Sequence, residues 1–182
     1  IQMDRRELLI DLIDDNLSRY DWLLSQISDD CLHWQPHPQA NSIAVTMWHC
    51  VRVFDVFLTQ HADGQPAEAE LWAKNGWSEK TGYNPYGIGL YGWGTVQEYT
   101  TAEVAAIPHF SREHLQGYFH EVLADVKARL TRLSEAELDA TAPGFGAKYS
   151  VFFWMKAPFM DLTRHLGECF ALKEMWERQQ AA

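Results

Sequence analysis

The residues best suited to bind a metal ion lie in two distant parts of the sequence. Asp161, His165 and Glu168 are spaced by four and then three residues, so a helix would place them on one face. His49 interrupts an apolar stripe at helical spacing, which predicts an inward position. Buried ionisable groups are costly unless they are paired or bound to a metal. We therefore expect His49, Asp161 and His165 to share one divalent ion near one end of a helical fold.

Each part of this pattern also has a simpler interpretation. His49 alone could be a core histidine whose hydrogen bonds are satisfied by the protein. Asp161 and His165 could form a hydrogen bond on a solvated helix face, with Arg164 beside them. The other histidines are interpreted as loop, surface or helix-end residues rather than ligands: His33, His37, His61, His109, His114 and His120.

Other catalytic chemistries lack their motifs. The sequence has no G-x-S-x-G nucleophile turn and no phosphate-binding glycine motif. Cys50 follows His49 directly, and adjacent helical residues diverge by about 100°. The paired Glu-x-x-His motifs of ferritin-like di-iron bundles are missing. Three cysteines without a C-x-x-C motif are typical of a reducing compartment, and we expect a cytoplasmic protein.

The elements that must position these residues are four amphipathic helices. Apolar residues recur at three-to-four spacing, and Val, Ile and Thr alternate with polar residues over no useful length. The length fits one domain over residues 1–182. We predict an all-α four-helix bundle with helices at about 4–28, 42–60, 111–133 and 150–178.

A long connection separates the second and third helices. Residues 62–110 are rich in Gly, Pro and aromatic residues, with short helices expected at 67–75 and 101–106. Such a link suits a bundle whose middle helices run parallel, which predicts up-down-down-up order. A long connection rich in rings is expected to be functional rather than disordered. The rings predicted to reach the metal cavity are Trp72, Trp77, Tyr91 and Trp93.

Charge excludes several partners. The chain carries 15 Lys and Arg against 25 Asp and Glu, a net charge of −10. Nucleic acids and anionic membranes both require clustered basic residues. No apolar run approaches the roughly 20 residues of a membrane helix. The first residues lack a secretory apolar region, although the chain begins with Ile and its true start stays open. Aromatic residues reach 13%, which also makes a homodimer plausible.

Several short motifs, in their order and spacing, resemble the DinB/YfiT-like superfamily. That superfamily includes mycothiol-dependent maleylpyruvate isomerases and bacillithiol transferases. The similar stretches span most of the chain and are residues 32–38 (LHWQPHP), 41–49 (NSIAVTMWH), 62–64 (ADG), 71–77 (LWAKNGW) and 161–168 (DLTRHLGE).

The resemblance implies an up-down-down-up bundle with a divalent ion, commonly zinc or nickel. By position, the family's three ligands fall on His49, Asp161 and His165. Many relatives have histidine at the position of Asp161, whereas the maleylpyruvate isomerase branch has a carboxylate. Relatives often have Gln at the position of Glu168, so this chain departs from them there. In the thiol-dependent relatives a low-molecular-weight thiol binds the metal as the nucleophile.

These observations lead to two classes of function. The first is a metal-dependent enzyme, either a thiol-dependent transferase or isomerase acting on a small molecule, or a metal-dependent hydrolase. Glu168 would be its general base or would orient His165. Asn16 and Tyr20 of the first helix are candidate pocket residues, although Asn16 could equally be a surface amide. The second class is a non-catalytic metal-binding or dimeric bundle.

Overall fold

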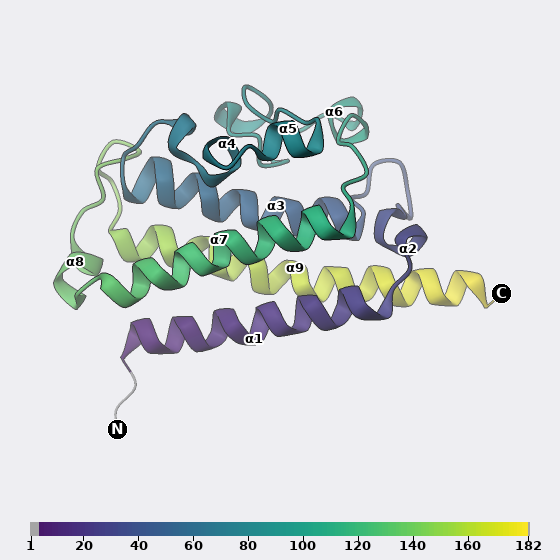
Figure 1. The fold of residues 1–182 in the computed structure, drawn as a ribbon, viewed down its shortest axis with the longest axis horizontal. Helices are drawn as coiled ribbons and strands as arrows, with labels where there is room; N and C mark the ends of the chain where they lie inside the picture. Colours follow the sequence, from purple (N-terminus) through teal and green to yellow (C-terminus); the bar gives the residue numbers. More distant parts are fainter. Residues whose placement is uncertain (1–3, 182) are drawn as a thin grey trace.

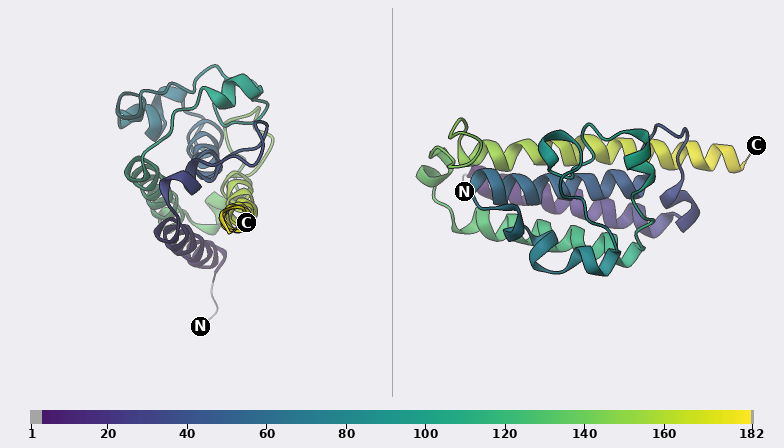
Figure 2. Two further views of the ribbon diagram at one scale, coloured as in Figure 1. Left: turned by 90° about the vertical axis from the view of Figure 1, so that its right-hand side faces the viewer. Right: turned by 90° about the horizontal axis from the view of Figure 1, so that it is seen from above.

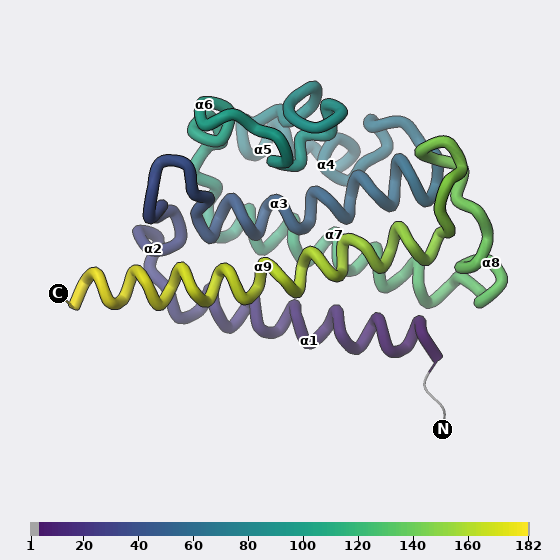
Figure 3. Tube along the Cα trace, turned by 180° about the vertical axis from the view of Figure 1, so that it is seen from behind, coloured from purple at the N-terminus to yellow at the C-terminus, as the bar shows by residue number. Residues whose placement is uncertain are grey.

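A computed structural model describes residues 4–181, and four long helices dominate it (Figure 1). Helices α1 and α9 run in one direction in that view, and α3 and α7 run in the opposite direction. Seen from behind, α9 lies between α1 and α3 (Figure 3). No β-strand occurs between residues 4 and 181, where one isolated bridge joins Thr141 and Ser150. The long helices are α1 (Arg5–Gln26), α3 (Ile43–Val56), α7 (Arg112–Arg132) and α9 (Val151–Gln180).

Each long helix begins at a residue whose side chain caps it. Asp4 and Glu7 form a capping box at the start of α1. Ser42, Ser111 and Ser150 accept hydrogen bonds from main-chain N–H groups in the first turns of α3, α7 and α9. A capping oxygen satisfies one of the N–H groups that a helix start leaves without a partner. The helices therefore start within two residues of the positions expected from the sequence.

The structure differs from the sequence prediction in its short elements. The segment between the first two predicted helices contains an additional helix, α2 (Asp29–His33), which Ser28 caps. Helix α3 ends at Val56 and continues as the π-helical segment η1 (Phe57–Ala62) rather than as α-helix to residue 60. Helix α5 (Trp77–Thr81) was not expected; it lies between Gly76 and Gly82, which both have positive φ. Helix α9 contains Pro158 in its interior.

The long connection packs across α3 and α7 as a layer of short helices (Figures 1 and 2). It consists of η2 (Ala67–Ala69), α4 (Leu71–Lys74), α5, η3 (Leu90–Gly92) and α6 (Thr101–Ala105). A further short helix, α8 (Glu135–Asp139), lies between α7 and α9 in the chain. No helix in the described part of the chain has the length and apolarity needed to cross a membrane.

The core lies between the four long helices and extends into this layer. Trp72 and Trp77 are buried, and their rings contact each other and Tyr118 of α7. Trp48 of α3 packs against Trp72 with ring centroids 5.6 Å apart. These large rings join the layer to the bundle, and their burial is a major part of the hydrophobic stabilisation.

Candidate metal centre

Three side chains from two helices converge on one point. His49 comes from α3, and Asp161 and His165 come from successive turns of α9. One ligand atom from each lies within 4.8 Å of the other two. Asp161 and His165 are the eleventh and fifteenth of the 30 residues of α9, so the cluster lies along the side of the bundle rather than near the end that we expected.

The ring of His49 has a fixed orientation. Its Nδ1 atom makes a hydrogen bond with the main-chain oxygen of Thr95. A carbonyl oxygen can only accept, so Nδ1 carries the proton. In the neutral ring the other nitrogen, Nε2, is then an acceptor, and it lies 2.9 Å from Oδ2 of Asp161. Two acceptors at this distance repel each other unless a proton or a cation lies beside them.

His165 is held in a similar way. Its Nδ1 atom donates to Oε2 of Glu168 at 2.5 Å, and its Nε2 atom lies 3.5 Å from Oδ1 of Asp161. The rings of His49 and His165 meet edge to face with centroids 5.0 Å apart. Glu168 thus contacts the nitrogen that faces away from the cluster. This is the contact that fixes the tautomer of a metal-binding histidine.

The charges of the cluster depend on one another. Hydrogen bonds to Asp161 and Glu168 raise the pKa of His165 to about 9. Burial alone would raise the pKa of Asp161, but the neighbouring His165 and His49 outweigh it and hold this pKa well below its usual range. The bond from His165 lowers the pKa of Glu168. Arg164 also forms an ion pair with Asp161, although its side chain is 70% exposed.

The donor set fits a divalent metal ion. Oδ2 of Asp161 is buried, and no hydrogen-bond donor among the described residues points at it. Two imidazole nitrogens and a carboxylate oxygen match the ligand preferences of zinc and related ions. The outer nitrogens of both rings are bonded to acceptors, so the inner nitrogens are the ones that could coordinate. Nη2 of Arg164 lies 3.1 Å from the inner nitrogen of His165, and its exposed side chain would have to move when an ion binds. His49, Asp161 and His165 could therefore hold one ion, as the sequence pattern predicted.

The cluster is reached from the surface through a small depression. Its volume is about 220 Å³, and its lining residues are Asn41, His49, Val96, Gln97, Arg164 and His165. Val96 and Gln97 belong to the long connection, which therefore contributes to the site. None of the four aromatic residues expected there lines this depression.

The structure gives those four rings other positions. Trp72 and Trp77 belong to the core, and the indole N–H of Trp77 donates to Glu121. The side chain of Tyr91 is 69% exposed. Trp93 packs on Phe57 and His61 and lies only two residues before Thr95 in the chain. Trp72, Trp77 and Trp93 attach the connection to the bundle, so the aromatic content of the segment did not indicate a pocket wall.

The two pocket candidates of α1 are buried behind the cluster. The hydroxyl of Tyr20 donates to the main-chain oxygen of Leu162 at 2.9 Å, so it supports α9 beside Asp161. Asn16 donates to the main-chain oxygen of Leu12 within α1. Neither residue lines the depression, and Asn16 is buried rather than a surface amide.

Sequence analysis did not identify two contributors to the site. Thr95 acts through its main-chain oxygen, and any residue type could supply that atom, so the sequence carried no signal for it. Arg52 is a fully buried arginine within the apolar helix α3. A charged residue three positions after His49 in so apolar a segment was a signal that could have been used.

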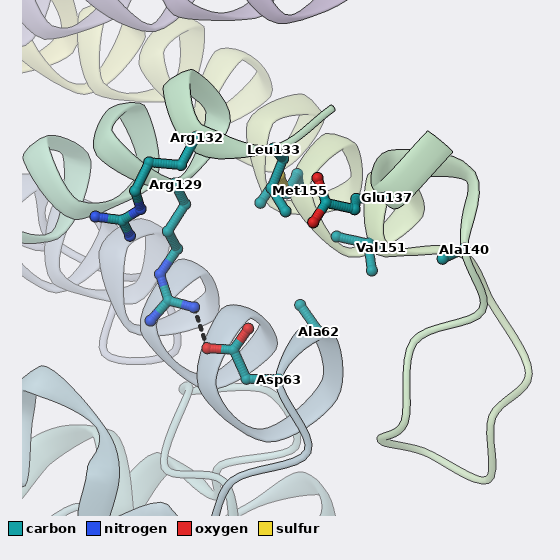
Figure 4. A pocket seen from close by; sticks show the side chains of 9 residues that line it. All are labelled: Ala62, Asp63, Arg129, Arg132, Leu133, Glu137, Ala140, Val151 and Met155. Atoms are coloured by element: carbon teal, nitrogen blue, oxygen red, sulfur yellow. Dashed lines mark hydrogen bonds and ion pairs between the residues drawn. The ribbon is translucent and has the colours of Figure 1, made fainter. Parts of the chain in front are cut away.

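A larger cavity lies elsewhere on the molecule (Figure 4). Its volume is about 460 Å³, and residues of η1, α7, α8 and α9 line it. Arg129 pairs there with Asp63, and Glu137 accepts the capping bonds of Ser134. No histidine or cysteine lines this cavity. Its carboxylates already have partners, so this cavity presents no set of free metal ligands.

Comparison with known proteins identifies the family of this fold. The model of the DinB superfamily matches residues 12–169. One similar solved structure is described as a conserved protein from Enterococcus faecalis; it has a TM-score of 0.77 and 18% sequence identity. The match covers 94% of this chain and 96% of that one, and at this identity the likeness shows the fold alone. No curated protein matches the sequence.

Proposed function

This chain belongs to the DinB superfamily, and from that premise we propose that it is a divalent-metal-dependent enzyme acting on a small molecule. In this proposal His49, Asp161 and His165 hold the ion, with zinc or nickel preferred. A low-molecular-weight thiol is the nucleophile, in a group transfer or an isomerisation.

The main support for a bound metal ion is that two hydrogen-bond acceptors, Nε2 of His49 and Oδ2 of Asp161, lie 2.9 Å apart. Three protein ligands are typical of catalytic sites, because further coordination positions stay open for exchangeable molecules. When bound, a divalent ion would lower the pKa of a coordinated thiol or water toward neutrality.

The cysteines of the chain support an external thiol. Cys31, Cys50 and Cys169 are all buried. Burial raises the pKa of the Cys50 and Cys169 thiols, and Cys31 is shifted in the same direction. A buried thiol with a raised pKa is a poor nucleophile. A thiol-dependent reaction at this site would therefore need a thiol that enters with the substrate.

Residues around the depression supply recognition rather than coordination. Asn41, Gln97 and Arg164 can each donate hydrogen bonds to a polar small molecule, whereas Val96 offers an apolar contact. The side chain of Glu168 makes one hydrogen bond to another described residue, the bond to Nδ1 of His165. We therefore assign it the role of holding His165 in its coordinating tautomer, in preference to that of general base.

Titration of the metal-loaded protein with a thiol tests this proposal. Purified protein is analysed for metal, then loaded with Co²⁺ and titrated with cysteine while its absorption spectrum is recorded. We expect one ion per chain and a thiolate-to-metal charge-transfer band. The Asp161→Ala variant should give neither.

Other outcomes distinguish the alternatives. If the metal-loaded protein binds no thiol but hydrolyses esters, the result would favour a metal-dependent hydrolase. An ion that accepts no exchangeable ligand would indicate a non-catalytic bundle. Wild-type protein that binds no divalent ion would overturn the proposal as a whole.

A further inference from the structure

Arg52 connects the metal centre to the interior of the protein. It lies three residues after His49 on α3, and its side chain is fully buried. A buried guanidinium is costly unless ion pairs and hydrogen bonds compensate it. The guanidinium of Arg52 has such partners on both sides. Acidic side chains lie on one side, and main-chain oxygens lie on the other.

The acidic side anchors the guanidinium. Its Nη1 atom lies 2.8 Å from Oε2 of Glu70 and 3.5 Å from Oδ2 of Asp55. Asp55 also accepts from the main-chain N–H groups of Leu71 and Trp72, at 2.9 Å each. These contacts join α3 to the start of α4 and leave Arg52 little freedom to move.

The other side holds the segment that orients His49. Nη2 of Arg52 donates to the oxygen of Trp93 at 2.9 Å, and Nε donates to the oxygen of Gly94 at 3.3 Å. The next oxygen along the chain, that of Thr95, accepts from His49. Three consecutive carbonyl groups are thus bound by two side chains that lie one helical turn apart.

Gly94 makes this close approach possible. Its φ is +64°, and a Cβ at this position would lie 2.3 Å from the main-chain oxygen of Pro85. Any other residue would displace the segment or strain it. The position of the Thr95 oxygen therefore depends both on Arg52 and on the absence of a side chain at Gly94.

We propose that Arg52 is a positioning residue for the metal centre. Its guanidinium fixes residues 93–95, so that the oxygen of Thr95 keeps the proton of His49 on Nδ1 and directs the Nε2 lone pair toward Asp161. The role in metal binding rests on the proposed function, whereas the control of the His49 tautomer does not. Outer-sphere partners of a ligand commonly change metal affinity by about 10- to 100-fold.

Lysine cannot replace arginine in this role. A guanidinium presents five N–H donors in a planar fork, whereas an ammonium group is a compact point charge. In Arg52→Lys the ammonium can still neutralise Glu70, but it cannot also reach the oxygens of Trp93 and Gly94 from the same position. The substitution should therefore release the 93–95 segment while it preserves the buried charge.

The experiment compares three variants with the wild type. Arg52→Lys and Gly94→Ala both disturb the 93–95 segment, and Gly94→Ala changes no charge. Ser78→Ala is the matched control, because it removes a hydroxyl of the long connection that accepts from the indole N–H of Trp72 at 2.9 Å and makes no hydrogen bond to Arg52 or to residues 93–95. Zn²⁺ affinity is measured by competition with a chromophoric chelator. The tautomer of His49 is measured in metal-free protein by long-range ¹H–¹⁵N NMR.

We expect Arg52→Lys and Gly94→Ala to weaken Zn²⁺ binding about 10- to 100-fold and to give a mixture of His49 tautomers. Ser78→Ala should lower the melting temperature and change neither readout. Unchanged affinity and an unchanged His49 spectrum in Gly94→Ala would overturn the inference, even if Arg52→Lys failed to fold. If the wild type binds no Zn²⁺, the proposed function fails, and the NMR spectra alone decide the role of Arg52.

Discussion

Helix α3 carries two clusters of ionisable side chains that differ in how their hydrogen bonds are satisfied. Around Arg52, the donors of one guanidinium meet the carboxylates of Asp55 and Glu70 in a fully buried position. Around His49, acceptor atoms face acceptor atoms beside a depression that opens to the surface. In the first cluster the carboxylates of Asp55 and Glu70 meet donors, whereas in the second the buried Oδ2 atom of Asp161 has no hydrogen-bond partner among the described residues. An unsatisfied buried acceptor, rather than burial or charge as such, therefore marks the second cluster as the candidate binding site.

The two clusters differ because α3 faces different elements on successive turns. His49 meets α9, whose residues Asp161 and His165 bring two further ligands. Arg52 and Asp55 meet the long connection, which brings Glu70 and main-chain groups. The predictions below test whether one cluster governs folding and the other governs metal binding.

The largest effect is expected from Glu70→Ala. Removing one partner of a buried ion pair leaves the other charge uncompensated, which costs about 3–5 kcal/mol. We expect urea unfolding to show a loss of that size in the free energy of unfolding. Glu68→Ala is the control, because Glu68 is an exposed acid on the same segment. A loss below about 1 kcal/mol would place Glu70 among ordinary surface residues.

Asp161→Ala should separate metal binding from folding. The loss of one of three ligands should weaken Zn²⁺ binding by more than the roughly 100-fold range of outer-sphere changes. Four apolar helix faces hold the bundle, so the variant should stay folded at 25 °C with chelator present. Circular dichroism melting and chelator competition measure the two properties. Glu174→Ala, also on α9, is the control. A variant that unfolds would indicate a structural ion, and full metal retention would remove Asp161 from the site.

Substitutions of Glu168 should have a smaller effect on Zn²⁺ affinity than Asp161→Ala, and the effect should depend on the residue introduced. Glu168→Ala removes the acceptor that holds Nδ1 of His165, so we expect Zn²⁺ affinity to fall about 10- to 100-fold. Glu168→Gln should lose less, because an amide oxygen can still accept that hydrogen bond. Equal metal affinities in the wild type and both variants would mean that Glu168 does not position His165. Isothermal titration calorimetry resolves these differences.

The smallest expected effect is a pH dependence of the metal-free protein. The pKa of His165 is about 9 in the folded chain and near 6.5 in an unfolded one. Stabilisation by this group is complete below pH 6.5 and is lost as the pH rises through about 9. Melting temperatures measured with chelator should therefore fall more steeply over this range in the wild type than in His165→Gln. Parallel curves would contradict the prediction. Because the proton competes with the metal, Zn²⁺ affinity should rise over the same pH range.

Much of the fold could be predicted from the sequence because helices are local structures. The four long helices follow from apolar spacing, and their starts follow from capping residues such as Ser42 and Ser150. The pairing of Asp161 with His165 is equally local, because a spacing of four residues places both on one helix face. The short elements were harder to predict: α2 has five residues and η1 is a π-helix, and segments of this length carry little periodicity.

The sequence by itself determined the helices, the acidic surface and the two-residue half of the metal site. The tertiary structure alone decided that His49 meets that half, since His49 and Asp161 are 112 positions apart in the sequence. It also decided that Trp72 and Trp77 fill the core rather than the site, and that a main-chain oxygen at Thr95 selects the tautomer of His49. The physical reason is that spacing along a helix fixes directions within that helix. The contacts between distant segments depend on how every other side chain packs.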